Sequence, residues 1–127
     1  MSLILDAGPF LAVERADRDV VALLKREQLA GRLPITHGGI VAQVWRTGTG
    51  RQANLARLLA AAEVKPLDEE LGKAAGVLLR LTGGADDAID SALVCLARDG
   101  DEILTSDPGD LRDLAEAAGL QIDVVPV

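Results

Sequence analysis

DAIDSALVCLARDGDEILTSDPGDL (residues 87–111) contains a helix and a strand whose pattern determines the predicted architecture. From Asp87 to Arg98 the chain is apolar nearly all round, which predicts a buried central helix. Ile103-Leu104 is a short apolar strand that ends in a turn at residues 105–108. A buried helix followed by a short buried strand is typical of a parallel sheet covered by helices on both faces.

The rest of the chain repeats this alternation of strands and helices. Short apolar runs predict further strands at 3–5, 33–35, 64 and 122–125. Apolar residues at helical spacing predict helices that start at Pro9, span about 17–30, follow Thr36 as N-cap, and include 55–62, 71–78 and 111–118. We therefore expect one α/β domain over residues 1–127, with three layers and a short, mostly parallel central sheet of about five strands flanked by helices.

The composition excludes several classes of protein. One Cys excludes an internal disulfide framework and a Cys-cluster zinc site, and one His excludes a multi-His metal site. Phe10 and Trp45 are the only aromatic residues, which argues against a base-stacking platform. No uncharged run reaches the ~18 residues of a membrane span, and no basic segment typical of a signal peptide precedes the first apolar run. We expect a soluble, cytoplasmic protein.

The net charge of −7 is concentrated in one segment. Residues 84–113 contain nine acids and two bases, which gives 2 − 9 = −7, and the remaining residues balance with 11 of each. Such a segment is either a solvated acidic face or a site for a divalent cation, because Mg²⁺ and Mn²⁺ prefer carboxylate oxygens.

Four aspartates are candidates for such a site. Asp6 directly follows the first strand, Asp107 follows the strand at 103–104 by two residues, and Asp87 and Asp90 share one face of the buried helix. Ligands of open parallel sheets bind outside the carboxyl ends of the strands, so these carboxylates converge if the two strands are neighbours and the buried helix packs beside them. Oxygen ligands without His or Cys favour Mg²⁺ or Mn²⁺.

Each acid also has a structural interpretation. Asp107 and Asp87 are both well placed as helix N-caps, and Asp110 is favourable in a first helical turn. Asp90 is expected to be at least partly buried, and Asp6 is not required as a cap because Gly8 and Pro9 can start the helix. These two residues therefore favour a site more strongly than the other acids.

Three further residues have mainly structural interpretations. His37 is expected at a helix start rather than as a ligand, and Cys95 as a small buried hydrophobe. Trp45 is expected in the core or in a dimer interface.

Taken together, the motifs resemble those of the PIN-domain ribonucleases, and among them the VapC-type toxins of bacterial toxin–antitoxin pairs. LILDAGPFLAVERAD resembles the first strand and loop of that family, with Asp6 as its first acid. THGGIVAQVWRTG resembles its second strand and helix, and residues 87–111 resemble its third and fourth acid segments, with Asp90 and Asp107 in place. The resemblance implies a single PIN-like domain with catalytic and metal-binding Asp6, Asp90 and Asp107.

The sequence departs from the family at Gln43, where the family usually has Glu. Gln keeps a carbonyl oxygen but has no charge. Asp87 is the candidate that supplies the missing charge as a further metal ligand, and Glu14 is a second candidate.

The resemblance also implies a function and partners. The function is Mg²⁺- or Mn²⁺-dependent hydrolysis of RNA phosphodiesters to 5′-phosphate and 3′-hydroxyl ends, with Arg15, Arg46 and Arg51 as candidates for contacts with the RNA backbone. The implied partners are a small antitoxin protein, one segment of which occupies a groove, and a second copy of the chain in a homodimer.

Two alternatives remain open at the level of sequence. The first is a degenerate PIN fold that binds RNA or a partner without cleavage, which Gln43 motivates. The second is another fold with an acidic pocket, either a phosphatase of the haloacid-dehalogenase type or a phospho-acceptor receiver. The phosphatase usually has Asp-x-Asp after its first strand, where this chain has Asp6-Ala7-Gly8, and the receiver's Lys normally follows the Thr/Ser strand, whereas Lys65 precedes it.

Overall fold

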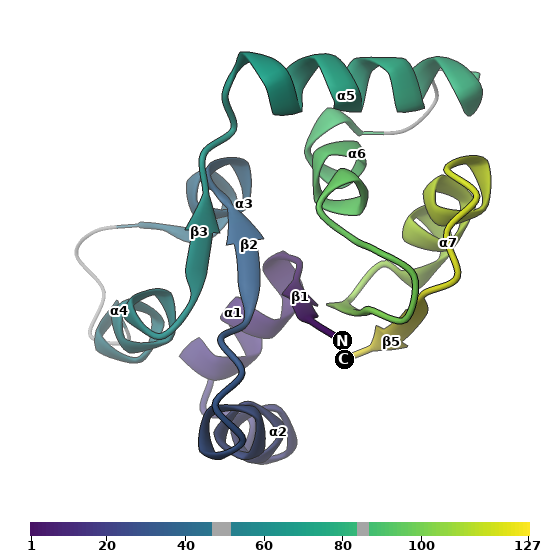
Figure 1. Ribbon diagram of the computed structural model, residues 1–127. Coiled ribbons are helices and arrows are strands. Elements are labelled where there is room, and N and C mark those ends of the chain that lie inside the picture. Colours follow the sequence, from purple (N-terminus) through teal and green to yellow (C-terminus); the bar gives the residue numbers. More distant parts are fainter. Residues whose placement is uncertain (47–51, 84–86) are drawn as a thin grey trace.

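The computed structural model describes residues 1–46, 52–83 and 87–127. In this part of the chain, one or two helices separate each strand from the next (Figure 1). In chain order they are β1 (Leu3–Leu5), α1 (Ala7–Glu14), α2 (Arg18–Leu29), β2 (Ile35–His37), α3 (Gly38–Val44), α4 (Gln52–Ala60), β3 (Glu63–Lys65), α5 (Glu69–Leu81), α6 (Ala88–Cys95), β4 (Glu102–Thr105), α7 (Pro108–Ala117) and β5 (Asp123–Pro126).

The strands form one parallel sheet in the order β3-β2-β1-β4-β5. The predicted α/β fold with a central parallel sheet is confirmed. The direction of winding reverses between β1 and β4, which makes the junction of these two strands the topological switch point where such sheets bind ligands. Receiver domains have the order 2-1-3-4-5, so the sheet excludes the receiver alternative.

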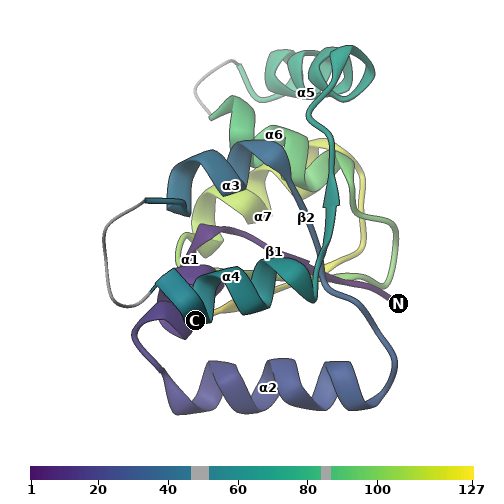
Figure 2. The same ribbon diagram turned by 90° about the vertical axis from the view of Figure 1, so that its left-hand side faces the viewer.

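The helices cover both faces of the sheet. α1 packs against α2, α3 and α4, while α6 packs against α5 and α7. Figure 2 shows α5, α6 and α7 on one side of the sheet and α2 and α4 on the other. The core between these layers includes Ile4, Phe10, Leu93, Ile103 and Leu111, all with no exposed surface. The buried central helix predicted from the sequence is α6.

Several predicted boundaries differ from the structure. α6 ends at Cys95 rather than near Arg98, because its last turn tightens: the N–H groups of Leu96 and Ala97 donate to carbonyls only three residues back. β2 comprises residues 35–37 rather than 33–35. Thr36 is therefore a buried strand residue rather than the N-cap of α3, and His37 caps that helix instead.

The described residues contain no helix with both the length and the apolar character needed to cross a membrane.

Candidate metal centre

Three carboxylates converge beside the switch point of the sheet. Asp90 in the first turn of α6, Asp107 after β4 and Asp110 in the first turn of α7 each have a ligand oxygen within 4.8 Å of the others. Asp90 is partly buried, whereas Asp107 and Asp110 are exposed. Two of these three acids, Asp90 and Asp107, were predicted from the sequence. Asp110 was assigned only to the electrostatics of its helix, although the spacing of three residues from Asp107 would have placed both acids on the same helical turn.

Asp6 lies at the buried side of this region and is not within the group of three. It is 7% exposed, and both of its oxygens have partners. Oδ1 accepts from the Ala7 N–H at 2.8 Å, and Oδ2 accepts from the Thr105 hydroxyl at 2.6 Å. Asp6 is the N-cap of α1, which begins at Ala7. The expectation that Asp6 is not needed as a cap is therefore wrong, because the helix starts earlier than Pro9.

Thr105 joins the two acids that follow the neighbouring strands. Its hydroxyl donates to Asp6 and accepts from the Asp107 N–H at 2.9 Å. The Asp6 N–H donates to the Leu104 carbonyl at 3.0 Å and so extends the pairing of β1 with β4 beyond the strand. These contacts fix the start of α1 against the turn that carries Asp107.

Gly8 permits the close approach of these two segments. A Cβ at this position would overlap with the Ser106 hydroxyl and lie 2.8 Å from the Ser106 backbone nitrogen. The turn 105–108 therefore packs directly on the backbone of α1, and the sequence provides the only residue type that leaves room for it.

The capping interpretations have different outcomes for Asp87 and Asp107. The Asp87 side chain caps α6, since Oδ1 accepts from the N–H groups of Ile89 at 2.6 Å and Asp90 at 3.4 Å. Asp107 occupies the N-cap position of α7 but its carboxylate makes no cap hydrogen bond. The carboxylate of Asp107 is therefore not required for the helix start.

Burial and the negative charge of the site raise the pKa of Asp90. The pKa of this carboxyl is raised from 3.8 to about 7, first by burial and then by the negative charges of Asp6, Asp87, Asp107 and Asp110. Like charges at close range destabilise one another unless a proton or a cation neutralises them. The donor set consists of oxygen atoms alone, which suits Mg²⁺ or Mn²⁺. The residues therefore fit a divalent ion.

The other predicted residues lie around this site or outside the described residues. Gln43 is exposed on α3, and Glu14 is partly buried at the end of α1. Arg15 is exposed, whereas the Arg46 guanidinium donates to the carbonyls of Ala42 at 3.1 Å and Trp45 at 2.6 Å. Arg51 falls outside the described residues.

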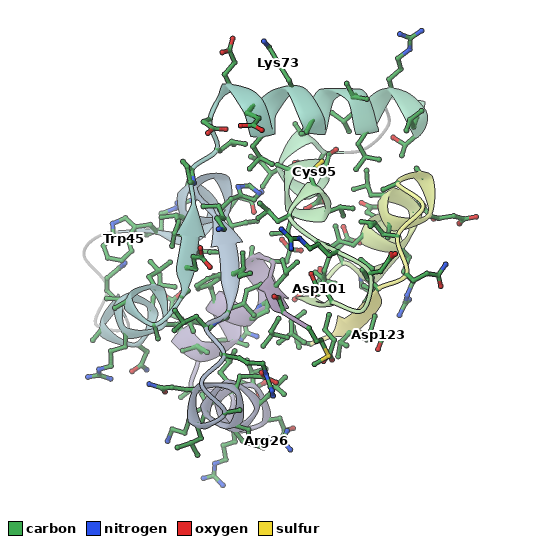
Figure 3. All side chains as sticks on the ribbon, viewed as in Figure 1. Arg26, Trp45, Lys73, Cys95, Asp101 and Asp123 are labelled. Atoms are coloured by element: carbon green, nitrogen blue, oxygen red, sulfur yellow. The ribbon has the colours of Figure 1, made fainter. Side chains whose placement is uncertain are left out.

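Cys95 is less buried than expected, and of the two positions expected for Trp45 the structure excludes only the core. Trp45 is 39% exposed and is not a core residue, and Figure 3 places it on the same side of the molecule as α4. Cys95 is partly buried, and burial raises the pKa of its thiol. His37 is at a helix start as predicted.

The comparisons with known proteins find similar solved structures but no match in sequence. No protein-family model matches the chain, and no curated protein does. A chain in the crystal structure of VapBC2 from Rickettsia felis, bound to a DNA fragment from their promoter, superimposes with a TM-score of 0.71 at 12% sequence identity. The match covers 98% of both chains. The chain therefore has the fold of a VapC-type PIN domain.

Proposed function

We propose that this protein is a Mg²⁺- or Mn²⁺-dependent endoribonuclease and acts as the toxin of a toxin–antitoxin pair. The observation that carries this proposal is the convergence of Asp90, Asp107 and Asp110 within 4.8 Å beside the switch point of the sheet. The likeness of the whole fold to a chain of a VapBC complex supports the toxin assignment.

Asp90 and Asp107 would hold the ion, with Asp110 as a further ligand that the sequence did not indicate. Asp6 would complete the negative site from the buried side, where the Thr105 hydroxyl fixes its orientation. Asp87 adds charge near Asp90, but its Oδ1 is engaged as a helix cap, so it contributes less directly than predicted. Asp110 thus provides a carboxylate in a site where the family Glu is replaced by Gln43.

A bound ion would lower the pKa of its water and neutralise charge on the phosphate that is cleaved. The protein's own contribution is to hold the carboxylates that follow the two neighbouring strands, those of Asp6 and Asp107, near the carboxylate of Asp90 on α6. Arg15 is exposed and can contact the RNA backbone. Arg46 is less available for this role because it binds the carbonyls at the end of α3.

The test is cleavage of a labelled RNA with Mg²⁺ or Mn²⁺, in the presence and absence of chelator. We expect 5′-phosphate and 3′-hydroxyl products, and loss of cleavage in Asp6→Asn and in Asp90→Asn. Asp113→Asn is the matched control, because Asp113 is an exposed acid of α7 outside the cluster and the substitution changes the net charge equally. Full activity in both site variants would reject the metal-site assignment.

The antitoxin is expected to occupy the groove between α1, α2 and α4. This pocket has a volume of about 420 Å³ and combines apolar side chains with three cations: Val13, Leu24, Leu58, Lys25, Arg32 and Arg57. A peptide segment with apolar residues on one face and carboxylates beside them matches this lining. Co-expression with a short neighbouring reading frame should yield a complex in which the RNase activity is suppressed. Leu24→Glu in the groove should weaken that complex.

A homodimer is the second assembly that we propose. Exposed apolar side chains outside the groove include Trp45, Val64, Leu67, Val77 and Leu81. Light scattering should give twice the monomer mass, and a monomer at all concentrations would contradict the proposal.

A degenerate, non-cleaving PIN protein is the alternative, and Gln43 is its motive. Calorimetric titration with Mn²⁺ separates the two, because saturable binding together with cleavage excludes degeneracy. Binding of antitoxin without Mn²⁺ binding or RNA cleavage would favour it.

A further inference from the structure

β2 ends without an acidic residue. Its last two side chains, those of Thr36 and His37, nevertheless form hydrogen bonds to the backbone carbonyls of the residues that precede Asp6 and Asp90. Thr36 donates from its hydroxyl to the Leu5 carbonyl at 2.9 Å, and Leu5 directly precedes Asp6. The His37 Nε2 lies 3.0 Å from the Ile89 carbonyl, and Ile89 directly precedes Asp90. Thr36 and His37 have no exposed surface. The two side chains therefore hold the segments before Asp6 and Asp90 from one strand.

The two contacts of the His37 ring determine its tautomer. Nδ1 accepts from the Gly39 N–H at 3.0 Å, so this nitrogen carries no proton. The Ile89 carbonyl can only accept, so Nε2 carries the proton and donates. Both nitrogens of the neutral ring are satisfied, and an imidazolium would place an N–H of Nδ1 against the N–H of Gly39. Burial is the largest influence on the pKa of His37 and lowers it, which favours the same neutral form.

The contact with Ile89 acts on the peptide unit that leads into Asp90. This unit is planar, so its carbonyl oxygen and the Asp90 N–H move together. The oxygen accepts from His37, and the N–H faces Asp87 Oδ1 at 3.4 Å. Asp87 Oδ1 also accepts from the Ile89 N–H at 2.6 Å. The orientation of the first turn of α6 is thus fixed from both sides.

Close packing against Gly39 and Ile89 holds the His37 ring in one position. A Cβ on Gly39 would lie 2.5 Å from Ile89 Cδ1 and 2.8 Å from His37 Cε1. Glycine therefore leaves the space in which the ring and the Ile89 side chain meet. A ring enclosed in this way cannot rotate away from the Ile89 carbonyl without displacing its neighbours.

We propose that His37 is a positioning residue for the acidic site: its neutral imidazole ties the first turn of α6 to the first turn of α3 and holds Asp90 where it meets Asp107 and Asp110. This inference rests on the proposed metal-dependent function. In this proposal α3 supports the site through its N-cap residue His37. The helix has Gln43 at the position where the family usually has an acidic side chain.

Two substitutions separate the two contacts of the ring. His37→Asn keeps the cap of α3, because Asn is a good N-cap, but its side chain is too short to reach the Ile89 carbonyl. His37→Gln provides an amide N–H that reaches Ile89. Ser91→Ala is the control, because it removes another buried hydrogen bond of α6, in which Ser91 donates to the Ala75 carbonyl of α5 at 2.8 Å. It leaves the contact of His37 with α6 intact.

The experiment is Mn²⁺ titration by calorimetry of the folded variants, with urea unfolding of each as a measure of stability. Loss of contacts that orient metal ligands typically costs about 10–100-fold in affinity, and we expect about a tenfold loss in His37→Asn, partial recovery in His37→Gln and no change in Ser91→Ala. A metal-free ¹H–¹⁵N NMR spectrum of the wild-type imidazole should show a neutral ring protonated on Nε2.

The outcomes distinguish this inference from the proposed function. If wild-type protein binds Mn²⁺ and His37→Asn binds it equally well, the positioning role is wrong while the metal site stands. An equal loss of affinity in Ser91→Ala, or a ring protonated on Nδ1, would also overturn it. If wild-type protein does not bind Mn²⁺, the metal site itself is wrong and the positioning role falls with it.

Discussion

Asp90→Asn should stabilise the metal-free protein while it abolishes metal binding. In the wild-type protein, burial and four neighbouring acids raise the pKa of Asp90 from 3.8 to about 7. At 1.36 kcal/mol per pKa unit, this corresponds to a penalty of about 4 kcal/mol for the charged form in the folded protein. Because the side chain is only partly buried, solvent screening reduces the expected gain to about 2 kcal/mol. Asn has nearly the same shape and no charge, so it removes this penalty.

The pH dependence of the gain follows from linkage. The folded pKa of Asp90 lies above its unfolded value, so between pH 4 and about pH 7 the folded state binds more protons than the unfolded state. The contribution of Asp90 to stability is therefore favourable at low pH and is lost as the pH rises through about 7. The difference in unfolding free energy between Asp90→Asn and wild type should grow from pH 4 to pH 7 and then become constant.

Urea unfolding in the presence of chelator at several pH values measures this difference. Asp113→Asn serves as the control, since an exposed acid outside the cluster should change stability by less than about 0.5 kcal/mol. If Asp90→Asn were no more stable than wild type at pH 8, or if the difference did not depend on pH, the proposed crowding of charge around Asp90 would be wrong.

Mn²⁺ affinity should rise about tenfold per pH unit below pH 7 and level off above pH 7, because Asp90 must lose its proton to bind the ion. Calorimetry in buffers of different ionisation enthalpy measures the proton release, and an affinity that does not depend on pH would contradict the prediction. Asp87→Ala should lower the free energy of unfolding by about 1 kcal/mol through loss of the α6 cap, whereas Asp87→Asn should keep the cap and the stability. Equal melting temperatures of the two variants would argue against the cap. Gly8→Ala should lower the free energy of unfolding by about 1–3 kcal/mol, because the new Cβ displaces the Ser106 turn, and the loss should be accompanied by weaker Mn²⁺ binding; unchanged stability and affinity would contradict the close packing at this turn.

The architecture could be predicted because local pattern and tertiary role agree for most elements. β1 and the apolar part of β4 are short apolar runs because both faces of the central strands are buried. α6 is apolar nearly all round because it packs against other helices and the sheet. β2 was misplaced by two residues because Thr36 and His37 are polar. Their burial depends on hydrogen bonds to Leu5 and Ile89, which are distant in sequence.

The candidate site could be predicted in its members but not in its arrangement. The positions of Asp6 and Asp107 after two strands, and of Asp90 near the start of the buried helix, indicated the convergence, because the carboxyl ends of neighbouring parallel strands share one edge of the sheet. The outward position of Asp110 and the enclosure of Asp6 depend on the turn between β4 and α7. That turn is packed through the Gly8–Ser106 contact, which no local pattern specifies.

The most direct test of the metal centre is a crystal structure with Mn²⁺ bound, examined by anomalous diffraction. A peak in contact with carboxylate oxygens of Asp90 and Asp107, with Asp6 or Asp110 beside it, is the expected result. Anomalous density elsewhere on the surface, with none at these aspartates at saturating Mn²⁺, would contradict the account.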